Sequence, residues 1–285
     1  MAEGRRALRA LLGAPGLVVA PGAWDAVTAR LVEQAGFPAV YMSGAATSLA
    51  AGYPDFGLLT ATEMADNAGV LARAVVVPVI ADADTGYGNE LNVTRTVRDY
   101  EARGVAGIHI EDQAMPKRCG HLDGKEVVGR EDFVSKIRAA VAARSDPDFV
   151  IIARTDARQP LGFDEAIARA NAALAAGADA AFVEAVETVE ELTAVPRLVA
   201  GPCLYNVVLG GKTPVVPMAD AARYGYRIAI LPGLLMRAAV AAMDEALAAF
   251  HASGTPPEAK PGALIKSFNR FGAEEWRALG ERFKH

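Results

Sequence analysis

The residues Lys117, Arg118, Cys119, Gly120 and His121 form the stretch KRCGH, which gathers scarce reactive groups in one place. The chain has only two cysteines and four histidines, and one of each lies here. Cationic neighbours favour a thiolate, so we expect them to lower the pKa of Cys119. A thiol tuned in this way could act as a general acid or base, or as a nucleophile. The alternative is a solvated basic loop with an incidental cysteine.

A second reactive group consists of acidic residues that follow apolar runs. Asp82 and Asp84 in DADTGYG are two residues apart, so they point to the same side of an extended strand. Burying two carboxylates is costly unless a cation neutralises them, and Glu111 from the next apolar run can complete the set. Oxygen ligands of this kind suit Mg²⁺, with Mn²⁺ as an alternative. Each acid could instead cap a helix or bind loop amides.

Other polar residues that follow apolar runs have two interpretations each. Arg154 in IIARTDAR could grip a substrate carboxylate, or it could pair with Glu184 inside the protein. His109 could contact a substrate or be a hydrogen-bonded core residue, and Asn206 could bind the backbone or a substrate. Cys203 lies at the start of an apolar run and is expected to be a small core residue, which argues against a zinc site.

Eight short apolar runs must position these residues, and each run ends in polar or glycine-rich sequence. The runs are continuous rather than alternating, which is typical of parallel strands buried on both faces. Helical segments lie between them, two of which begin with the capping pairs Thr60 with Glu63 and Thr188 with Glu191. The runs occupy residues 17–25, 39–44, 77–88, 106–113, 149–158, 180–185, 203–208 and 227–233.

This alternation predicts a (β/α)8 TIM-type barrel with an extra C-terminal helical segment. In such a barrel the active site lies at the carboxyl ends of the strands, where the polar residues fall. A doubly wound sheet is the competing fold, but it would usually show a glycine fingerprint after its first strand, and VVAPGAWD has none.

The end of the chain differs from the rest. We expect residues 1–254 to form the catalytic barrel and residues 255–285 to form a Pro/Gly linker and an amphipathic helix. The apolar face of that helix must be buried on the same barrel or on a neighbouring subunit, which suggests an oligomer. Its members are Phe268, Phe271, Trp276, Leu279 and Phe283.

The composition limits the class of protein. The 285 residues are 52% hydrophobic and 22% charged with a net charge of −5, which is typical of a folded protein and not of a nucleic-acid binder. A local cationic cluster could still bind a small anionic substrate. Two cysteines cannot form a disulfide framework, and they favour the cytoplasm. The first residues lack the apolar region and cleavage site of a secretory signal, so none is expected, and no apolar run approaches the ~20 residues of a membrane span.

The motifs KRCGH, DADTGYG, GIHIEDQ and IIARTDAR together resemble those of the isocitrate lyase/phosphoenolpyruvate mutase superfamily. The resemblance runs from PGAWDA to about LPG, and it is most similar to the methylisocitrate lyase, 2-alkylmalate lyase and carboxyvinyl-carboxyphosphonate phosphorylmutase branches. It implies a Mg²⁺-dependent barrel that acts on α-hydroxy or α-keto acids. It also implies a homotetramer, a dimer of dimers, in which neighbours exchange a C-terminal helix.

The resemblance also implies roles for individual residues. Asp82 and Asp84 would hold the metal, with Glu111 and Asp55 in supporting, often water-mediated positions. KRCGH would be a mobile gating loop, and its Cys119 would be the catalytic acid of the lyases, which favours carbon–carbon cleavage. The substrate would be bound by Ser43, Gly44, Ala45, Asp55, His109, Gly120, Arg154, Glu184, Asn206 and Arg237.

Two stretches depart from the methylisocitrate lyases. After the seventh run the chain reads NVVLGG, with Val208 and Leu209, where those enzymes read Asn-x-Thr-Glu. After the eighth it reads LPGLLMR, with Gly233 and Leu234, where those enzymes have a serine after the proline. These departures argue against a tricarboxylate and favour a smaller or more apolar 2-substituted malate.

The predicted activity is therefore retro-aldol cleavage of a 2-hydroxy di- or tricarboxylate to pyruvate, or a related oxo acid, and a second carboxylate. Tyr41 is a candidate base for the hydroxyl proton, and Cys119 protonates the departing carbon. Lys117, Arg118 and His121 hold the developing charge. The alternatives are a phosphonate mutase or hydrolase, an oxaloacetate decarboxylase, and a barrel that only binds a dicarboxylate.

Overall fold

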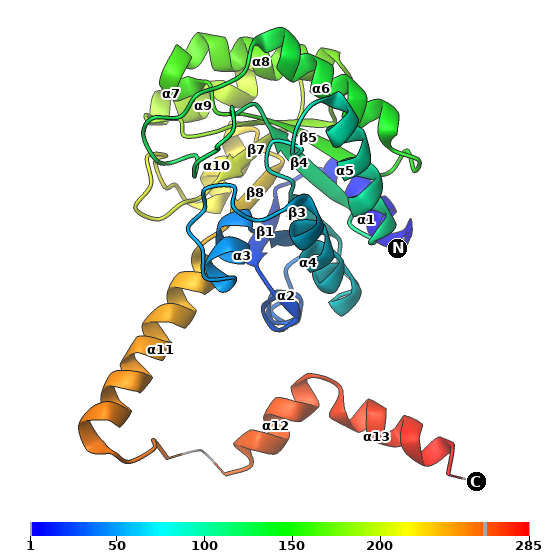
Figure 1. The fold of residues 1–285 in the computed structure, drawn as a ribbon, viewed down its shortest axis with the longest axis vertical. Helices are drawn as coiled ribbons and strands as arrows, with labels where there is room; N and C mark the ends of the chain where they lie inside the picture. Colours follow the sequence, from blue (N-terminus) through cyan, green and yellow to red (C-terminus); the bar gives the residue numbers. More distant parts are fainter. Residues whose placement is uncertain (1, 259–260, 285) are drawn as a thin grey trace. The chain divides into compact units, whose positions relative to one another are not determined.

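A closed barrel of parallel strands forms the centre of the fold, with helices around it (Figure 1). The computed structural model describes residues 2–258 and 261–284. Within them, each of the eight predicted runs contains one strand, and β8 pairs with β1 to close the barrel. The strands are β1 (Val18–Ala23), β2 (Val40–Met42), β3 (Val79–Asp82), β4 (Gly107–Glu111), β5 (Val150–Thr155), β6 (Ala180–Val183), β7 (Cys203–Asn206) and β8 (Ile228–Leu231). The predicted barrel architecture is confirmed.

Helices follow the strands and pack on the outside of the barrel. The chain divides into two compact units, residues 1–237 and 238–285. The helices up to residue 237 are α1 (Ala2–Gly13), α2 (Ala26–Gln34), α3 (Gly44–Ala50), α4 (Ala61–Ala74), α5 (Glu90–Ala102), α6 (Arg130–Ala143), α7 (Arg158–Leu161), α8 (Phe163–Ala175), α9 (Val189–Leu198), α10 (Met218–Tyr224) and the start of α11 (Leu234–Ser253).

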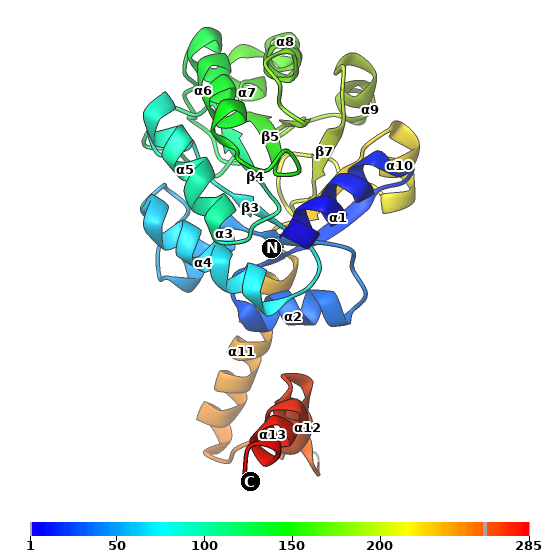
Figure 2. The same ribbon diagram turned by 90° about the vertical axis from the view of Figure 1, so that its right-hand side faces the viewer.

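Helix α1 closes the amino-terminal end of the barrel (Figure 2). Its Leu8 is fully buried in the cluster of side chains that fills the barrel interior. Arg5 donates to the carbonyl of Val105, just before β4, and Arg9 donates to the carbonyl of Phe149, just before β5. Because this end is filled, the carboxyl ends of the strands are left to form a site, as the barrel architecture predicts.

The predicted helix starts are confirmed at both capping pairs, although one pair forms only half of the motif. The Thr60 hydroxyl accepts the Glu63 amide, and the Glu63 carboxylate accepts the Thr60 amide in return. The Thr188 hydroxyl likewise accepts the Glu191 amide at 3.1 Å. The Glu191 carboxylate instead accepts the amide of Glu187 at 2.8 Å, so the second capping box is not reciprocal.

The second unit, residues 238–285, contains most of α11 together with two short helices. These are α12 (Ala263–Arg270) and α13 (Ala273–Arg282), separated at Gly272, whose φ of 90° lies in the left-handed region that glycine tolerates. The prediction of a single helix is therefore wrong. Residues 259 and 260 of the predicted linker lie outside the described residues. The boundary after residue 254 and the exchange of a helix between subunits stay predictions.

The part of the chain that the structure describes contains no helix long and apolar enough to cross a membrane. Several helices of the first unit, among them α4, α5, α6 and α8, bury one face. Helix α6, for example, buries Phe133 and Ile137 completely.

We expect the buried face of the helices to dominate the free energy of unfolding. Ile137→Ala removes a fully buried side chain from α6 and should lower the free energy of unfolding by about 2–5 kcal/mol. The control, Leu91→Ala in α5, changes a side chain that is 79% exposed and should stay within about 0.5 kcal/mol of wild type. Urea denaturation measures both values, and equal losses would contradict the packing described above.

Candidate active site

A cavity of about 130 Å³ lies at the carboxyl ends of the barrel strands. Its size is well below the roughly 300–1,000 Å³ that is common for drug-sized ligands, so it suits a small molecule. The predicted residues that line it are Tyr41, Ser43, Ala45, Asp55, Asp82, Cys119, Gly120, His121, Arg154, Glu184 and Asn206. Val208 and Gly233 line it as well, together with Phe182 and Pro232, which the sequence reasoning missed because apolar residues carry no chemical signal.

The segment between β4 and α6, residues 112–129, brings KRCGH to this cavity, and we refer to it as the β4–α6 loop. Its two ends pair with each other, because the Ala114 amide donates to the Glu126 carbonyl and the Val128 amide donates to the Asp112 carbonyl. The tip of the loop places Cys119 among the cavity-lining residues. The predicted position of KRCGH at the barrel mouth is thus confirmed.

The thiol of Cys119 does not have the predicted acidity. Burial raises its pKa, and the nearby carboxylates of Asp55 and Glu184 raise it further. Arg154 and a hydrogen bond from the His121 backbone lower it, but the net shift is upward. The expectation of a lowered pKa is therefore wrong, and the thiol is protonated at neutral pH.

The cations of KRCGH have different partners from those predicted. Lys117 is buried, and its Nζ lies 2.6 Å from Asp84 Oδ1 and also contacts Asp55. Burial alone would lower the pKa of Lys117, but these and other acids raise it well above its usual value. The guanidinium of Arg118 instead donates to the Asp123 carbonyl in an exposed position. The structure thus brings Lys117 to the site and leaves Arg118 outside the cavity.

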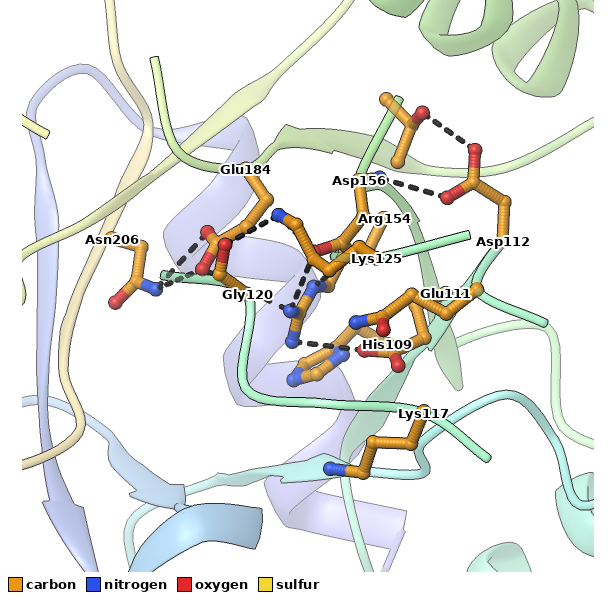
Figure 3. Close-up of polar contacts among 12 residues, drawn as sticks. His109, Glu111, Asp112, Lys117, Gly120, Lys125, Arg154, Asp156, Glu184 and Asn206 are labelled. Atoms are coloured by element: carbon orange, nitrogen blue, oxygen red, sulfur yellow. Dashed lines mark hydrogen bonds and ion pairs between the residues drawn. The ribbon is translucent and has the colours of Figure 1, made fainter. Parts of the chain in front are cut away.

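Arg154 is the centre of a buried ion network (Figure 3). Its Nε and Nη2 donate to the two carboxylate oxygens of Asp156, at 2.9 and 3.1 Å, and its Nη1 lies 3.0 Å from Glu111 Oε2. Glu184 is farther from Nη2, at 3.8 Å, and each of its carboxylate oxygens accepts from Asn206 Nδ2 at 3.1 Å. Arg154 therefore has internal partners and also faces the cavity, so both interpretations of it have support.

His121 of the loop also contacts Glu184, because its Nε2 lies 3.2 Å from Glu184 Oε1. Burial alone would raise the pKa of Glu184, but Arg154 and His121 hold it well below its usual range. Gly120 lies against the same pair, since a Cβ atom there would lie 2.3 Å from Glu184 Oε1 and 2.5 Å from Arg154 Nη2. The position therefore requires glycine.

Tyr41 and His109 form a buried pair beneath the cavity. The Tyr41 hydroxyl lies 2.8 Å from His109 Nε2 and 3.5 Å from Asp82 Oδ2. Burial and the charge of Asp82 raise the pKa of Tyr41 well above its usual value, so Tyr41 stays protonated and the prediction that it acts as a base is contradicted. His109 is fully buried, stacks on Tyr41, contacts Phe182 edge to face and does not line the cavity, which favours the core interpretation.

Only two of the three predicted metal ligands, Asp82 and Asp84, are placed together. Asp84 has a φ of 46°, which acidic residues tolerate, and its amide donates to Asp82 Oδ1 at 2.9 Å. Gly44 allows α3 to approach Asp82, because a Cβ atom there would lie 2.4 Å from Asp82 Oδ2. Within residues 2–258 and 261–284, however, no three His, Cys, Asp or Glu side chains converge as metal ligands. Glu111 instead lies beside Arg154, so the predicted set of three acids does not form.

Asp82 and Asp84 nevertheless fit a divalent cation. Burial would raise the pKa of Asp82, but neighbouring His109, Lys117 and Arg154 lower it overall, so the carboxylate is ionised. Asp84 Oδ1 is buried and, apart from the ammonium of Lys117 beside it, accepts no hydrogen bond. A pair of carboxylates that leaves further positions to water or substrate is the usual way in which proteins bind Mg²⁺.

Arg237 lies outside the main cavity. Its Nη1 donates to the Leu209 carbonyl, and its side chain lines a neighbouring cavity of about 140 Å³ with Leu209, Leu231 and Leu234. The two cavities share Val208 and Gly233 as lining residues. Arg237 therefore does not line the main cavity, where a substrate contact was predicted for it.

The fold and this cavity define a (β/α)8-barrel enzyme whose site combines acids, cations and a protonated thiol. The sequence pattern of the phosphoenolpyruvate phosphomutase family matches residues 8–251. The chain is 49% identical to 2,3-dimethylmalate lyase of Eubacterium barkeri over 83% of this chain and 82% of that protein. It is 46% identical to 2-methylisocitrate lyase of Aeropyrum pernix, over 87% and 80% respectively. The chain belongs to the PEP mutase/isocitrate lyase superfamily, which confirms the resemblance.

Solved structures show the same relationship. The trigonal crystal structure of 2,3-dimethylmalate lyase superposes with a TM-score of 0.93 at 41% identity, covering 100% of this chain and 96% of that one. Phosphonopyruvate hydrolase in complex with oxalate and Mg²⁺ superposes with a TM-score of 0.88 at 34% identity, covering 99% of each chain. The similarity in fold therefore covers nearly all of each matched chain.

We expect the alkylation of Cys119 to report its raised pKa. Only the thiolate reacts with iodoacetamide, so the rate should still rise past about pH 9, because an ordinary thiol has a pKa of about 8.5. Peptide mass spectrometry follows Cys119, and buried Cys203, whose pKa is raised to about 12, is the unreactive control in the same molecule. A rate that reaches its plateau near pH 7 would show the lowered pKa that the sequence suggested.

Proposed function

We propose that this protein is a Mg²⁺-dependent carbon–carbon lyase that cleaves a small 2-hydroxy dicarboxylate of the 2-alkylmalate type to an oxo acid and a second carboxylate. The observation that carries the proposal is the position of the Cys119 thiol, which faces the same small cavity as Asp82 and Arg154. A proton donor, a metal-binding carboxylate and an anion-binding cation are the groups that such a cleavage needs. The similarity to 2,3-dimethylmalate lyase supports the choice of substrate class.

Residues of the chain can bind a dicarboxylate from several sides. The Arg154 guanidinium and the His121 imidazole both line the cavity and can face a carboxylate. Asn206 uses its amide nitrogen on Glu184, which leaves its buried Oδ1 without a partner and able to accept a substrate hydroxyl. Ser43 lines the opposite wall at the end of β2.

Asp82 and Asp84 would hold Mg²⁺, or Mn²⁺ as an alternative. When bound, the ion would stabilise the negative charge that develops on substrate oxygen atoms. The Mg²⁺ complex of phosphonopyruvate hydrolase supports this assignment, because that protein has the same fold. Lys117 adds a positive charge beside Asp84 and so limits the repulsion among the acids around it.

Each proton that moves during the proposed bond cleavage can be assigned to a side chain of the site. The 2-hydroxyl loses its proton to the Asp55 carboxylate, which faces the cavity, and its oxygen becomes the carbonyl of the oxo acid. As the C2–C3 bond breaks, its electron pair moves to C3 and into the adjacent carboxylate. Cys119 then donates its proton to C3, for which a protonated thiol is required. Protonated Tyr41 can donate a hydrogen bond to the substrate but not remove its proton.

The far wall of the cavity supports an alkyl substituent rather than a third carboxylate. Val208, Pro232 and Gly233 follow the neighbouring strands β7 and β8 and line this wall, and none of them offers a charged side chain. The first arginine after β8 is Arg237, which donates to the Leu209 carbonyl and does not line the cavity. A carboxylate placed against this wall would lose its hydration without a compensating partner.

The experiment that tests the function is a substrate panel. We expect oxo-acid release from 2-alkylmalates, such as 2,3-dimethylmalate, to exceed release from 2-methylisocitrate in the presence of Mg²⁺. Cys119→Ser should lower kcat by about 10²–10⁴-fold, because a serine hydroxyl is a far weaker acid. The control, Cys203→Ala, replaces a buried cysteine at the start of β7 and should keep kcat within about twofold.

Full activity of Cys119→Ser would overturn the assignment of the acid. Phosphorus NMR with phosphonopyruvate detects a mutase or hydrolase, and CO₂ release from oxaloacetate detects a decarboxylase. Either activity without cleavage of any malate would replace the proposed function. Metal-dependent binding across the panel without turnover would instead identify a binding protein.

We also expect activity to depend on a metal that Asp82 holds. EDTA should abolish oxo-acid release, and added Mg²⁺ should restore it in wild type. Asp82→Ala should lower kcat by more than about a hundredfold at the same Mg²⁺ concentration, because the ion supplies several kcal/mol of charge stabilisation. The exposed acid Asp66 provides the control variant, Asp66→Ala. Unchanged activity in EDTA would contradict the metal assignment.

A further inference from the structure

Lys125 is a buried lysine of the β4–α6 loop that the proposed chemistry does not use. Its side chain is fully buried, and so is that of its acidic partner Asp156. Lys125 Nζ lies 3.1 Å from Asp156 Oδ1 and also donates a short hydrogen bond to the carbonyl of Gly120 (Figure 3). A lysine is buried in this way only when its charge is paired, so these contacts hold it in one position.

Gly120 is a point at which the backbone of the loop lies against charged groups of the site. A Cβ atom at Gly120 would overlap Glu184 and Arg154, so the backbone there lies directly on the two charged groups. Cys119 precedes this residue, and its position depends on the same segment of backbone. A donor that holds the Gly120 carbonyl therefore also sets the distance between the thiol and the cavity.

Asp156 anchors Lys125 to the barrel and couples it to Arg154. The same carboxylate accepts Arg154 Nε and Nη2, so it pairs with two cations at once. Its own backbone amide donates to Asp112 Oδ1 at 2.8 Å, and Asp112 in turn accepts Arg169 Nη1 at 3.0 Å. The anchor is thus a network at the ends of β4 and β5, and not a mobile surface pair.

Lys125 differs from the other side chains that hold the loop, because its acidic partner is not a residue of the proposed site. Lys117 reaches Asp84 and His121 reaches Glu184, which are residues of the proposed site. Neither Lys125 nor Asp156 lines the cavity. A change at Lys125 therefore alters the position of the loop without removing a group that faces the substrate.

We infer that Lys125 is a positioning residue, which holds Gly120 and hence the Cys119 thiol over the cavity through its contact with Asp156. Its role in turnover rests on the proposed function, but its role in holding the loop does not. Without the ammonium, the loop samples open positions, Cys119 becomes accessible to reagents, and the thiol is less often in place to donate its proton.

The test measures Cys119 alkylation by peptide mass spectrometry, with no substrate present. Lys125→Met keeps the length of the side chain but removes the charge and the donor. We expect Cys119 to react about tenfold faster than in wild type. A change of this size corresponds to the loss of one hydrogen bond that involves a charged group. Lys125→Gln, whose amide can still donate to Gly120, should give an intermediate rate and carries the test if Lys125→Met does not fold.

Cys203 in the same molecule separates loop opening from general destabilisation. Cys203 is buried in β7, far along the chain from the loop, and it should remain unreactive in every variant. If Cys119 and Cys203 gain reactivity together, or if neither does, Lys125 has a merely structural role and the inference is overturned. The matched control is Lys212→Met, which removes a cation that pairs with exposed Asp123 of the same loop and should leave both rates unchanged.

Kinetics with a substrate from the panel provide the second readout. Lys125→Met should lower kcat about tenfold with a smaller change in KM, because the cavity-lining groups are intact while the acid is displaced. An unchanged kcat in a variant whose loop has opened would overturn the effect on the thiol. If wild type turns over no substrate, faster alkylation of Cys119 alone still supports the loop-holding role, and only the proposed function fails.

Discussion

The pairing of buried charges at the carboxyl end of the barrel is the constraint on which the rest of the site depends. Arg154 and its partner Asp156 are almost removed from solvent, and the desolvation of such ions is repaid only when every partner is in place. The partners come from β4, β5 and the β4–α6 loop, so one network joins the barrel to the segment that covers it. The chemistry of the site follows from this arrangement.

Burial also decides which groups carry protons. At Cys119, burial and the nearby carboxylates of Asp55 and Glu184 outweigh the charge of Arg154, so the thiol keeps its proton. The same environment keeps Tyr41 protonated. Both groups are therefore donors, which fits a reaction that ends with protonation of a carbon. A nucleophilic cysteine would require the opposite electrostatic environment.

Much of the fold and the location of the site could be predicted from the sequence, because both depend on local patterns. Continuous apolar runs correspond to the strands, and the residues after them, such as Asp82 and Asn206, meet at one end of the barrel. Contacts between distant segments could not be predicted. Arg118 belongs to the same motif as Cys119 but faces solvent, and Lys125 has no sequence feature that distinguishes it from a surface lysine.

The sequence by itself determined the barrel, the family, and which residue types gather at the carboxyl ends of the strands. Only the tertiary structure decided how their charges are shared: that Glu111 lies beside Arg154 rather than completing a set of three metal ligands, and that KRCGH holds a protonated thiol. The physical reason is that propensity and periodicity act over a few neighbouring residues. The pKa of a buried group, in contrast, depends on every charge within several ångströms, whichever strand or loop supplies it.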